Sequence, residues 1–175
     1  MGRWVNLTPD AVFESVLAIE PAWLTSRGIR GLAVDLDNTL VPYGQPVPDP
    51  DIVEHIRNLT AAGLRIIIVS NARPHRASLA AKELGIAYLA NAGKPAVRAF
   101  RRALDLLGCE PGETAVIGDQ VFRDILGARR AGCLALLVNP MSSRDFPGTK
   151  LLRWPERLIV RHLQARGDWP IRNTP

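Results

Sequence analysis

The sequence predicts an α/β fold in which a doubly wound, mainly parallel sheet of five strands carries helices on both faces. Three observations lead to this prediction. Short apolar runs alternate with amphipathic stretches, the runs are apolar throughout, and most amphipathic stretches end at a glycine. Strands buried on both faces and separated by helices are typical of parallel sheets.

Each element has its own signal. Helix boundaries are indicated by the capping-box spacing of Asp51 and Glu54, by Pro95 at a first helical position, and by glycines after the helices. An additional amphipathic helix is expected near 10–19, inside a helical N-terminal extension over residues 1–30. The strands are expected at 32–36, 64–70, 86–90, 114–118 and 133–138, and the helices at 51–62, 76–84, 95–107, 121–131 and 154–166.

The length of 175 residues fits one domain over 1–175, which includes the extension and a basic amphipathic tail at 150–175. No apolar run approaches the ~20 residues of a membrane span, and no signal peptide is visible. Cys109 and Cys133 lack the spacing of a metal site. We therefore expect a cytoplasmic protein, either free or peripheral on the inner face of the membrane.

The formal net charge of +5 is concentrated near the C-terminus, where residues 144–175 hold seven Lys or Arg and three Asp or Glu. Such a tail favours an anionic partner, which could be acidic lipid, nucleic acid or an acidic protein face. A solvated helix face explains the same pattern equally well.

Polar residues follow four of the predicted strands. Carboxyl ends of parallel strands meet at one rim of the sheet, so these side chains are expected to lie together. Several carboxylates form a hard oxygen site for Mg²⁺. Two carboxylates at i and i+2 point the same way and can act as nucleophile and proton shuttle. Taken alone, each residue could also be a cap or a surface group. The set comprises Asp35, Asp37, Ser70, Asn71, Lys94, Asp119 and Asp124.

Four segments in order, "DLDNTL", "IIIVSN", "GKP" and "IGDQVFRD", resemble the motifs of the haloacid dehalogenase (HAD) superfamily of Mg²⁺-dependent phosphatases. Longer stretches such as "AGKPAVRAFRRAL" and "LLRWPERLIVRHL" resemble the YqeG-type branch of subfamily IIIA. That branch is similar to phosphatidylglycerophosphate phosphatases. The resemblance covers nearly the whole chain and implies a HAD-like fold.

The resemblance also implies the role of each residue. Asp35 would attack phosphorus, and Asp37 would protonate the leaving group and then activate water. Lys94 would stabilise the nucleophile. Mg²⁺ would be held by Asp35, Asp37 through its backbone carbonyl, Asp119 and Asp124. The phosphoryl oxygens would be bound by Ser70 and the Asn71 backbone, and Asn38 and Thr39 would be further substrate-binding residues. The chain departs from the usual pattern at Arg123 and at Ala72-Arg73-Pro74.

No cap domain fits between the motifs, which favours a large or membrane-bound phosphate ester because an open rim excludes water poorly. The tail helix could then lie on an anionic bilayer through its arginines, together with a second basic stripe at Arg98, Arg101 and Arg102. The tail arginines are Arg153, Arg157, Arg161 and Arg166.

Three alternatives remain open. The substrate could be a soluble ester such as a nucleotide, a sugar phosphate or a phosphoprotein. A phosphoacceptor module is disfavoured because no Asp follows the third strand, where Asn91 to Lys94 stand. Nucleic-acid contact is disfavoured because no basic motif with interleaved aromatics occurs. The oligomeric state is not predicted.

Overall fold

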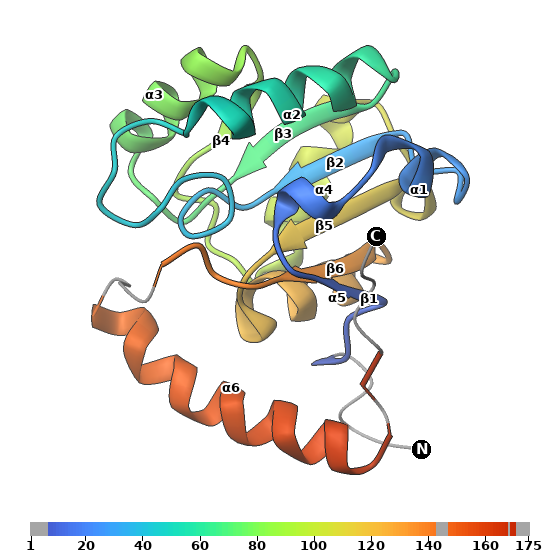
Figure 1. Cartoon of the computed structure of the whole chain (residues 1–175), viewed down its shortest axis with the longest axis vertical. Coiled ribbons are helices and arrows are strands. Elements are labelled where there is room, and N and C mark those ends of the chain that lie inside the picture. Colours follow the sequence, from blue (N-terminus) through green and yellow to red (C-terminus); the bar gives the residue numbers. More distant parts are fainter. Residues whose placement is uncertain (1–6, 143–146, 168, 171–175) are drawn as a thin grey trace.

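The computed structural model describes residues 7–142, 147–167 and 169–170 (Figure 1). Six parallel strands form one sheet in the order β1-β6-β5-β2-β3-β4. The α/β prediction is confirmed, but the expected number of five strands is too low by one. The strands are β1 (Ala11–Phe13), β2 (Gly31–Val34), β3 (Arg65–Val69), β4 (Ala87–Leu89), β5 (Thr114–Gly118) and β6 (Leu134–Val138).

Helices connect the strands and cover the sheet. The α-helices are α1 (Pro21–Thr25), α2 (Pro50–Ala61), α3 (Pro74–Leu84), α4 (Val97–Leu107), α5 (Leu126–Ala131) and α6 (Pro147–Ala165). The described residues also form three short helical segments, η2 (Val16–Ala18), η3 (Pro111–Glu113) and η4 (Val121–Ile125), of which η4 is π-helical.

The additional strand is β1, so the helix predicted near 10–19 is wrong. In the described part of the predicted helical extension over 1–30, β1 is followed by the helical segments η2 and α1. β1 pairs in parallel with β6, and its three residues are buried. Asp10 fixes the start of β1, because its carboxylate accepts a hydrogen bond from the Ala135 amide at 2.7 Å and pairs with Arg129 at 2.9 Å. The apolar spacing in this segment fits a helix, but pairing with the sheet edge decides the structure.

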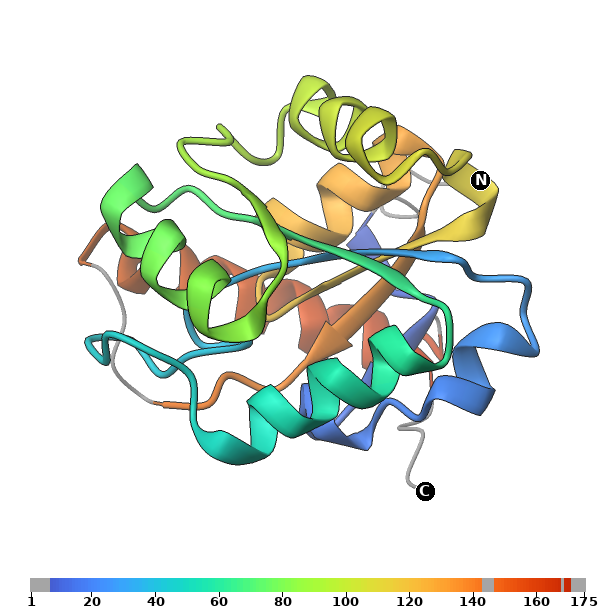
Figure 2. The ribbon, with the colours of Figure 1, turned by 90° about the horizontal axis from the view of Figure 1, so that it is seen from above.

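Two apolar layers enclose the sheet. One lies between the sheet and α2, α3 and the N-terminal segments, and the other lies between the sheet and α4 and α5. Side chains alternate along β2, where Leu32 and Val34 enter the first layer and Ala33 enters the second. The turned view shows α2 and α4 on opposite sides of the strands (Figure 2). No cap domain interrupts the described motifs, as predicted.

Several predicted boundaries change. The N-cap of α2 is Asp49, without the expected capping box at Asp51. α4 begins at Val97 and not at Pro95, because a turn closed by the hydrogen bond from the Ala96 amide to the Gly93 carbonyl precedes it. The helix predicted over 121–131 is divided between η4 and α5.

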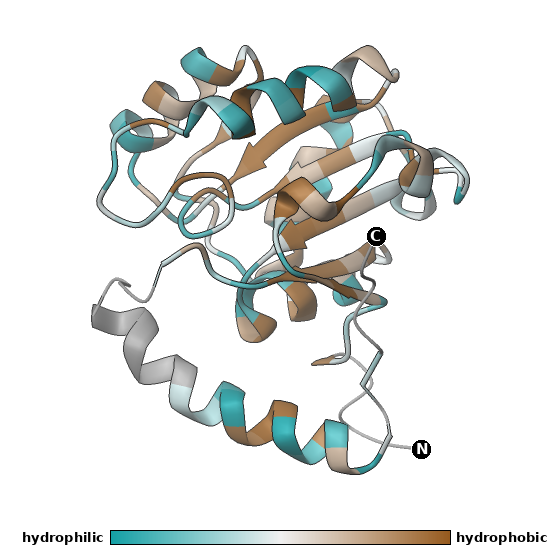
Figure 3. Cartoon of the chain, in the orientation of Figure 1, coloured by the Kyte–Doolittle hydropathy of each residue, from teal (hydrophilic) through white to brown (hydrophobic). Residues whose placement is uncertain are grey.

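α6 is longer than the predicted helix over 154–166, and it runs along β6 and η4 (Figure 1). Leu163 is buried in a small cluster with Leu7 and Val121. The hydropathy colouring shows apolar strands and a mixed pattern along the C-terminal half of α6 (Figure 3). Among the described residues, no helix has the length and apolarity that crossing a membrane requires. The prediction at Arg153 lies outside the described side chains.

Candidate active site

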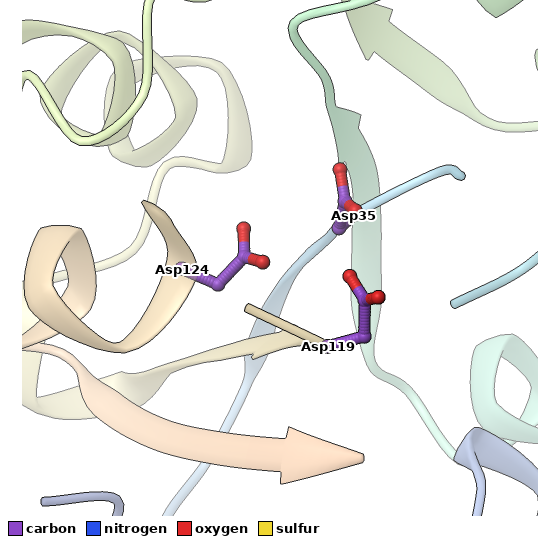
Figure 4. Close-up of side chains that lie close together, drawn as sticks. All are labelled: Asp35, Asp119 and Asp124. Carbon is purple, nitrogen blue, oxygen red and sulfur yellow. The ribbon is translucent and has the colours of Figure 1, made fainter. Parts of the chain in front are cut away.

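Three buried carboxylates converge at the carboxyl ends of the central strands (Figure 4). Asp35 follows β2, Asp119 follows β5, and Asp124 lies in η4. Each contributes an oxygen, and these atoms all lie within 4.8 Å of one another. The Asp35 amide also donates to the Ile117 carbonyl at 2.8 Å, which continues the pairing of β2 with β5. The adjacency of these two strands therefore creates the cluster.

Lys94 bridges two members of the carboxylate cluster. Its Nζ lies 2.6 Å from Asp35 Oδ1 and 2.6 Å from Asp124 Oδ1, and the lysine side chain is only 3% exposed. Burial alone would lower the pKa of Lys94, but the two carboxylates outweigh it and raise the pKa above its usual range. The ammonium group is therefore charged at neutral pH.

Asp124 is placed by the local backbone. Its Oδ2 accepts a hydrogen bond from the Gln120 amide at 3.2 Å, across the first turn of η4. A Cβ at Gly118 would overlap the Asp124 carboxyl group, so only glycine allows this approach. Burial raises the pKa of Asp124, and nearby Asp35 adds to the rise, while Lys94 opposes it. π-helical turns are frequent at functional sites because they redirect one side chain.

Asn71 holds the backbone of Lys94 from both sides. The Lys94 amide donates to Asn71 Oδ1 at 2.8 Å, and Asn71 Nδ2 donates to the Lys94 carbonyl at 3.2 Å. Ser70 is buried at the end of β3, and its hydroxyl oxygen accepts from the Ala72 amide at 3.0 Å. These contacts keep Lys94 in the turn before α4, from which its side chain reaches the cluster.

Asp37 lies at the edge of the site and is partly exposed. Arg76, from α3, donates two hydrogen bonds to Asp37 Oδ1, at 3.2 Å from Nε and 3.0 Å from an Nη atom. Burial raises the pKa of Asp37, while Arg76 opposes the rise and Asp35 adds to it. A carboxyl group with a raised pKa suits proton donation near neutral pH.

Asn38 and Thr39, predicted as substrate contacts, are each 1% exposed. Asn38 adopts a positive φ of 64°, and its Oδ1 accepts from the Tyr43 amide at 3.1 Å and from the Ser142 hydroxyl at 2.7 Å. The Thr39 hydroxyl is buried without a hydrogen-bond partner among the described residues. Asn38 thus joins two loops of the rim, and contact of either residue with substrate stays a prediction.

The structure therefore brings Asp35, Lys94, Asp119 and Asp124 together and places Asp37, Ser70 and Asn71 beside them. Sequence reasoning missed three residues. Arg76 has no local signal, because its partner is 39 positions away. Gly118 lies within the motif "IGDQVFRD". That a side chain at this position would overlap Asp124 can be seen only in the folded structure. Glu156 was detectable as the only acidic residue of the predicted basic helix.

Comparisons with known proteins show what the chain is similar to. A profile described as haloacid dehalogenase-like hydrolase matches residues 44–132. The chain is 35% identical over 159 residues to "Probable phosphatase YqeG" of Bacillus subtilis (strain 168), covering 91% of this chain and 92% of that protein. It is 28% identical over 158 residues to "Phosphatidylglycerophosphate phosphatase 1, chloroplastic/mitochondrial" of Arabidopsis thaliana.

The alignment with the Arabidopsis protein covers 85% of this chain but only 45% of that protein. Among solved structures, the cobalt-bound deoxy-D-mannose-octulosonate 8-phosphate phosphatase of Haemophilus influenzae has a TM-score of 0.53 at 18% identity. That alignment covers 81% of this chain and 91% of the other. At this identity the likeness shows the fold alone.

Proposed function

The chain belongs to the haloacid dehalogenase-like hydrolases and is a phosphatase, and from this premise we propose that it hydrolyses the phosphomonoester of phosphatidylglycerophosphate. One observation supports the catalytic part most directly. Carboxylates from three separate segments share a buried space with one ammonium group, and two of them are bonded to it at 2.6 Å. Such an arrangement suits charge stabilisation during phosphoryl transfer.

The residues present fit a magnesium ion. The donor set consists of hard carboxylate oxygens from Asp35, Asp119 and Asp124, which is the ligand type that Mg²⁺ prefers. Lys94 is paired with Asp35 and Asp124, and a divalent cation would further offset the repulsion among the three carboxylates. A bound ion would neutralise charge on the phosphoryl oxygens. The backbone carbonyl of Asp37 is proposed as a further ligand from the family pattern.

The protein's own side chains divide the reaction into two transfers. Asp35 attacks phosphorus and forms an aspartyl-phosphate, while the bond to the leaving oxygen breaks and Asp37 gives that oxygen its proton. This releases phosphatidylglycerol. Asp37 then takes a proton from water, whose oxygen attacks phosphorus, so that inorganic phosphate leaves and Asp35 is regenerated. Lys94 holds Asp35 in place, and Ser70 donates a hydrogen bond to the phosphoryl group.

Asp37 is suited to its double task by its contacts. Arg76 donates two hydrogen bonds to Oδ1 and a third to the Pro46 carbonyl, and among the described residues no hydrogen bond reaches Oδ2. The second oxygen is therefore available to the leaving group or to water. Because this side chain is partly exposed at the rim, it can exchange protons with solvent between the two transfers.

Two observations support a lipid substrate. The Arabidopsis relative is named for phosphatidylglycerophosphate. In addition, α6 exposes Trp154 and Leu158 on successive turns, at 68% and 47%, with Arg157 and Arg161 also exposed. Apolar and aromatic side chains beside arginines are typical of helices that lie on anionic bilayers. We therefore include peripheral contact with an acidic membrane in the proposal.

Phosphate release from a substrate panel tests the proposal. Phosphatidylglycerophosphate in vesicles, nucleotides and sugar phosphates are offered with Mg²⁺ or with EDTA. The expected result is Mg²⁺-dependent release from the lipid, which Asp35→Asn reduces to background. Asp105→Asn, on the exposed surface of α4, serves as the matched control. Preference for a soluble ester would overturn the substrate, and activity in Asp35→Asn would overturn the nucleophile.

Membrane contact needs a separate measurement. Leu158→Ser should weaken co-sedimentation with vesicles that contain acidic lipid. Leu106→Ser, an equally apolar and 59% exposed position on α4, should have no effect. Equal binding to acidic and neutral vesicles would contradict this part of the proposal without touching the chemistry.

A further inference from the structure

A pocket of about 660 Å³ lies between α6 and the carboxyl ends of β5 and β6. Asp119 lines one part of it and is also a member of the carboxylate cluster. Arg157, Val160 and Arg161 line it from α6. The pocket is therefore continuous with the catalytic centre, and a substrate whose phosphomonoester lies at the cluster can place the rest of its body there.

The wall formed by α6 is attached to the catalytic segment. Glu156 is 6% exposed, and its carboxylate accepts a hydrogen bond from the Phe122 amide at 2.9 Å. One and two turns further on, Val160 and Leu163 pack against the same part of the chain, where Val121 is buried. η4 thus holds Asp124 on one side and α6 on the other, so the pocket has a fixed position relative to the cluster.

The lining combines apolar surface with charged side chains of both signs: Asp119 lies at the cluster end, Glu156 is bonded to the Phe122 amide, and two arginines lie on α6. Arg157 and Arg161 stand four residues apart, which places both guanidinium groups on one face of α6. Among the described residues, no acidic side chain forms a salt bridge with either one. Val138 and Val160 supply apolar surface beside them. Two guanidinium groups that have no salt bridge within the described part of the chain favour a phosphate, which they can bind with several hydrogen bonds.

We propose that this pocket is a specificity subsite in which Arg157 and Arg161 bind a second, diester phosphate of the substrate while the apolar lining contacts its glycerol. The inference rests on the proposed function, since phosphatidylglycerophosphate carries a diester phosphate three carbons away from its monoester. The subsite distinguishes it from phosphatidic acid, which has a monoester alone. The arginines are positioning residues for the substrate and take no part in the transfer.

The test uses dihexanoyl lipids, which are water-soluble, so that membrane contact does not influence the result. The full-length Arg157→Gln/Arg161→Gln variant is compared with wild type on dihexanoyl phosphatidylglycerophosphate, dihexanoyl phosphatidic acid and p-nitrophenyl phosphate. The preference for the first substrate over the other two should fall by about 10- to 100-fold, mainly through KM, because one or two charged hydrogen bonds are lost. Arg57→Gln/Lys82→Gln, on the exposed surfaces of α2 and α3, removes the same charge and should keep the preference.

A binding measurement separates this inference from the proposed function. Dihexanoyl phosphatidylglycerol carries only the diester, and it should inhibit p-nitrophenyl phosphate hydrolysis competitively in wild type and about 10-fold more weakly in the double variant. If inhibition depends on the arginines but phosphatidylglycerophosphate is not hydrolysed, the proposed substrate is wrong and the subsite is supported. Turnover with an unchanged preference, or inhibition that ignores the arginines, would overturn the subsite.

Discussion

Substitution of Lys94 by Met removes the ammonium group that joins Asp35 to Asp124 while keeping a side chain of similar length. The two carboxylates would then face each other within 4.8 Å. At an effective dielectric constant of about 20, two unit charges at this distance repel by about 3.5 kcal/mol. Removing one partner of a buried ion pair typically costs about 3–5 kcal/mol, which agrees with this value.

The loss of stability cannot exceed the free energy of protonating one of the two carboxylates, because a protonated carboxyl group is no longer repelled. This upper limit depends on pH. The ordinary pKa of Asp124 is 3.8, and each unit of pH above it adds about 1.4 kcal/mol to the free energy of protonation. At about pH 8 that limit is about 6 kcal/mol, which exceeds the repulsion of about 3.5 kcal/mol. Both carboxylates therefore stay ionised, and the whole repulsion lowers the stability. At about pH 5 the limit is about 1.6 kcal/mol. Because the folded-state pKa is raised, stability is lost as the pH rises.

Urea denaturation of the variant and of wild type, in EDTA and at both pH values, measures these differences. Excess Mg²⁺ should recover more stability in Lys94→Met than in wild type, because the cation takes over the neutralisation of the carboxylates. Lys82→Met, on the exposed face of α3, should change stability by less than about 0.5 kcal/mol. A variant as stable as wild type at about pH 8 in EDTA, or a loss independent of pH, would refute the reasoning.

Three further predictions concern other parts of the chain. Gly118→Ala should displace the Asp124 carboxyl group and weaken Mg²⁺ binding by about 10- to 100-fold in calorimetry, whereas Gly112→Ala, with open space around it, should not. Burial lowers the pKa of His55, so the free energy of unfolding of wild type should fall as the pH drops below about 6.5. His55→Gln should lose that dependence, and parallel curves of unfolding free energy against pH for the two proteins would contradict this. Burial raises the pKa of Cys133 to about 11, so iodoacetamide should modify it at least about 100-fold more slowly in the folded than in the unfolded chain, as mass spectrometry can follow.

The central strands could be predicted because each is apolar on both faces and is bounded by turn residues. β5 has the predicted bounds, 114–118. β1 could not be predicted, since its three residues gain their hydrogen bonds from β6, more than 120 positions away. Its apolar pattern continues into Val16 and Ile19, so local spacing favours a helix. The π-helical turn η4 was missed because a shift from i+4 to i+5 bonding leaves no trace in residue spacing.

The residues that form the candidate site could be predicted from the sequence, but the contacts among them could not. Parallel strands bring their carboxyl ends to one rim, so residues after β2, β3 and β5 had to approach one another. The carboxylates that Lys94 contacts are determined by the turn before α4. That turn is held by the two hydrogen bonds between the Asn71 side chain and the Lys94 backbone. The contact from Glu156 to η4 joins segments 34 residues apart and had no local signal beyond its charge.

Charge balance leads to one more prediction about the order of binding. Asp35, Asp119 and Asp124 bring three carboxylates into one buried site, and Lys94 is ion-paired with Asp35 and Asp124. A phosphate dianion that approaches these carboxylates is repelled by them, and a divalent cation would offset that repulsion. Inorganic phosphate should therefore bind detectably in calorimetry with Mg²⁺ and not in EDTA, and Asp105→Asn should behave like wild type. Phosphate that binds equally well in EDTA would show that the protein's own donors outweigh the carboxylates.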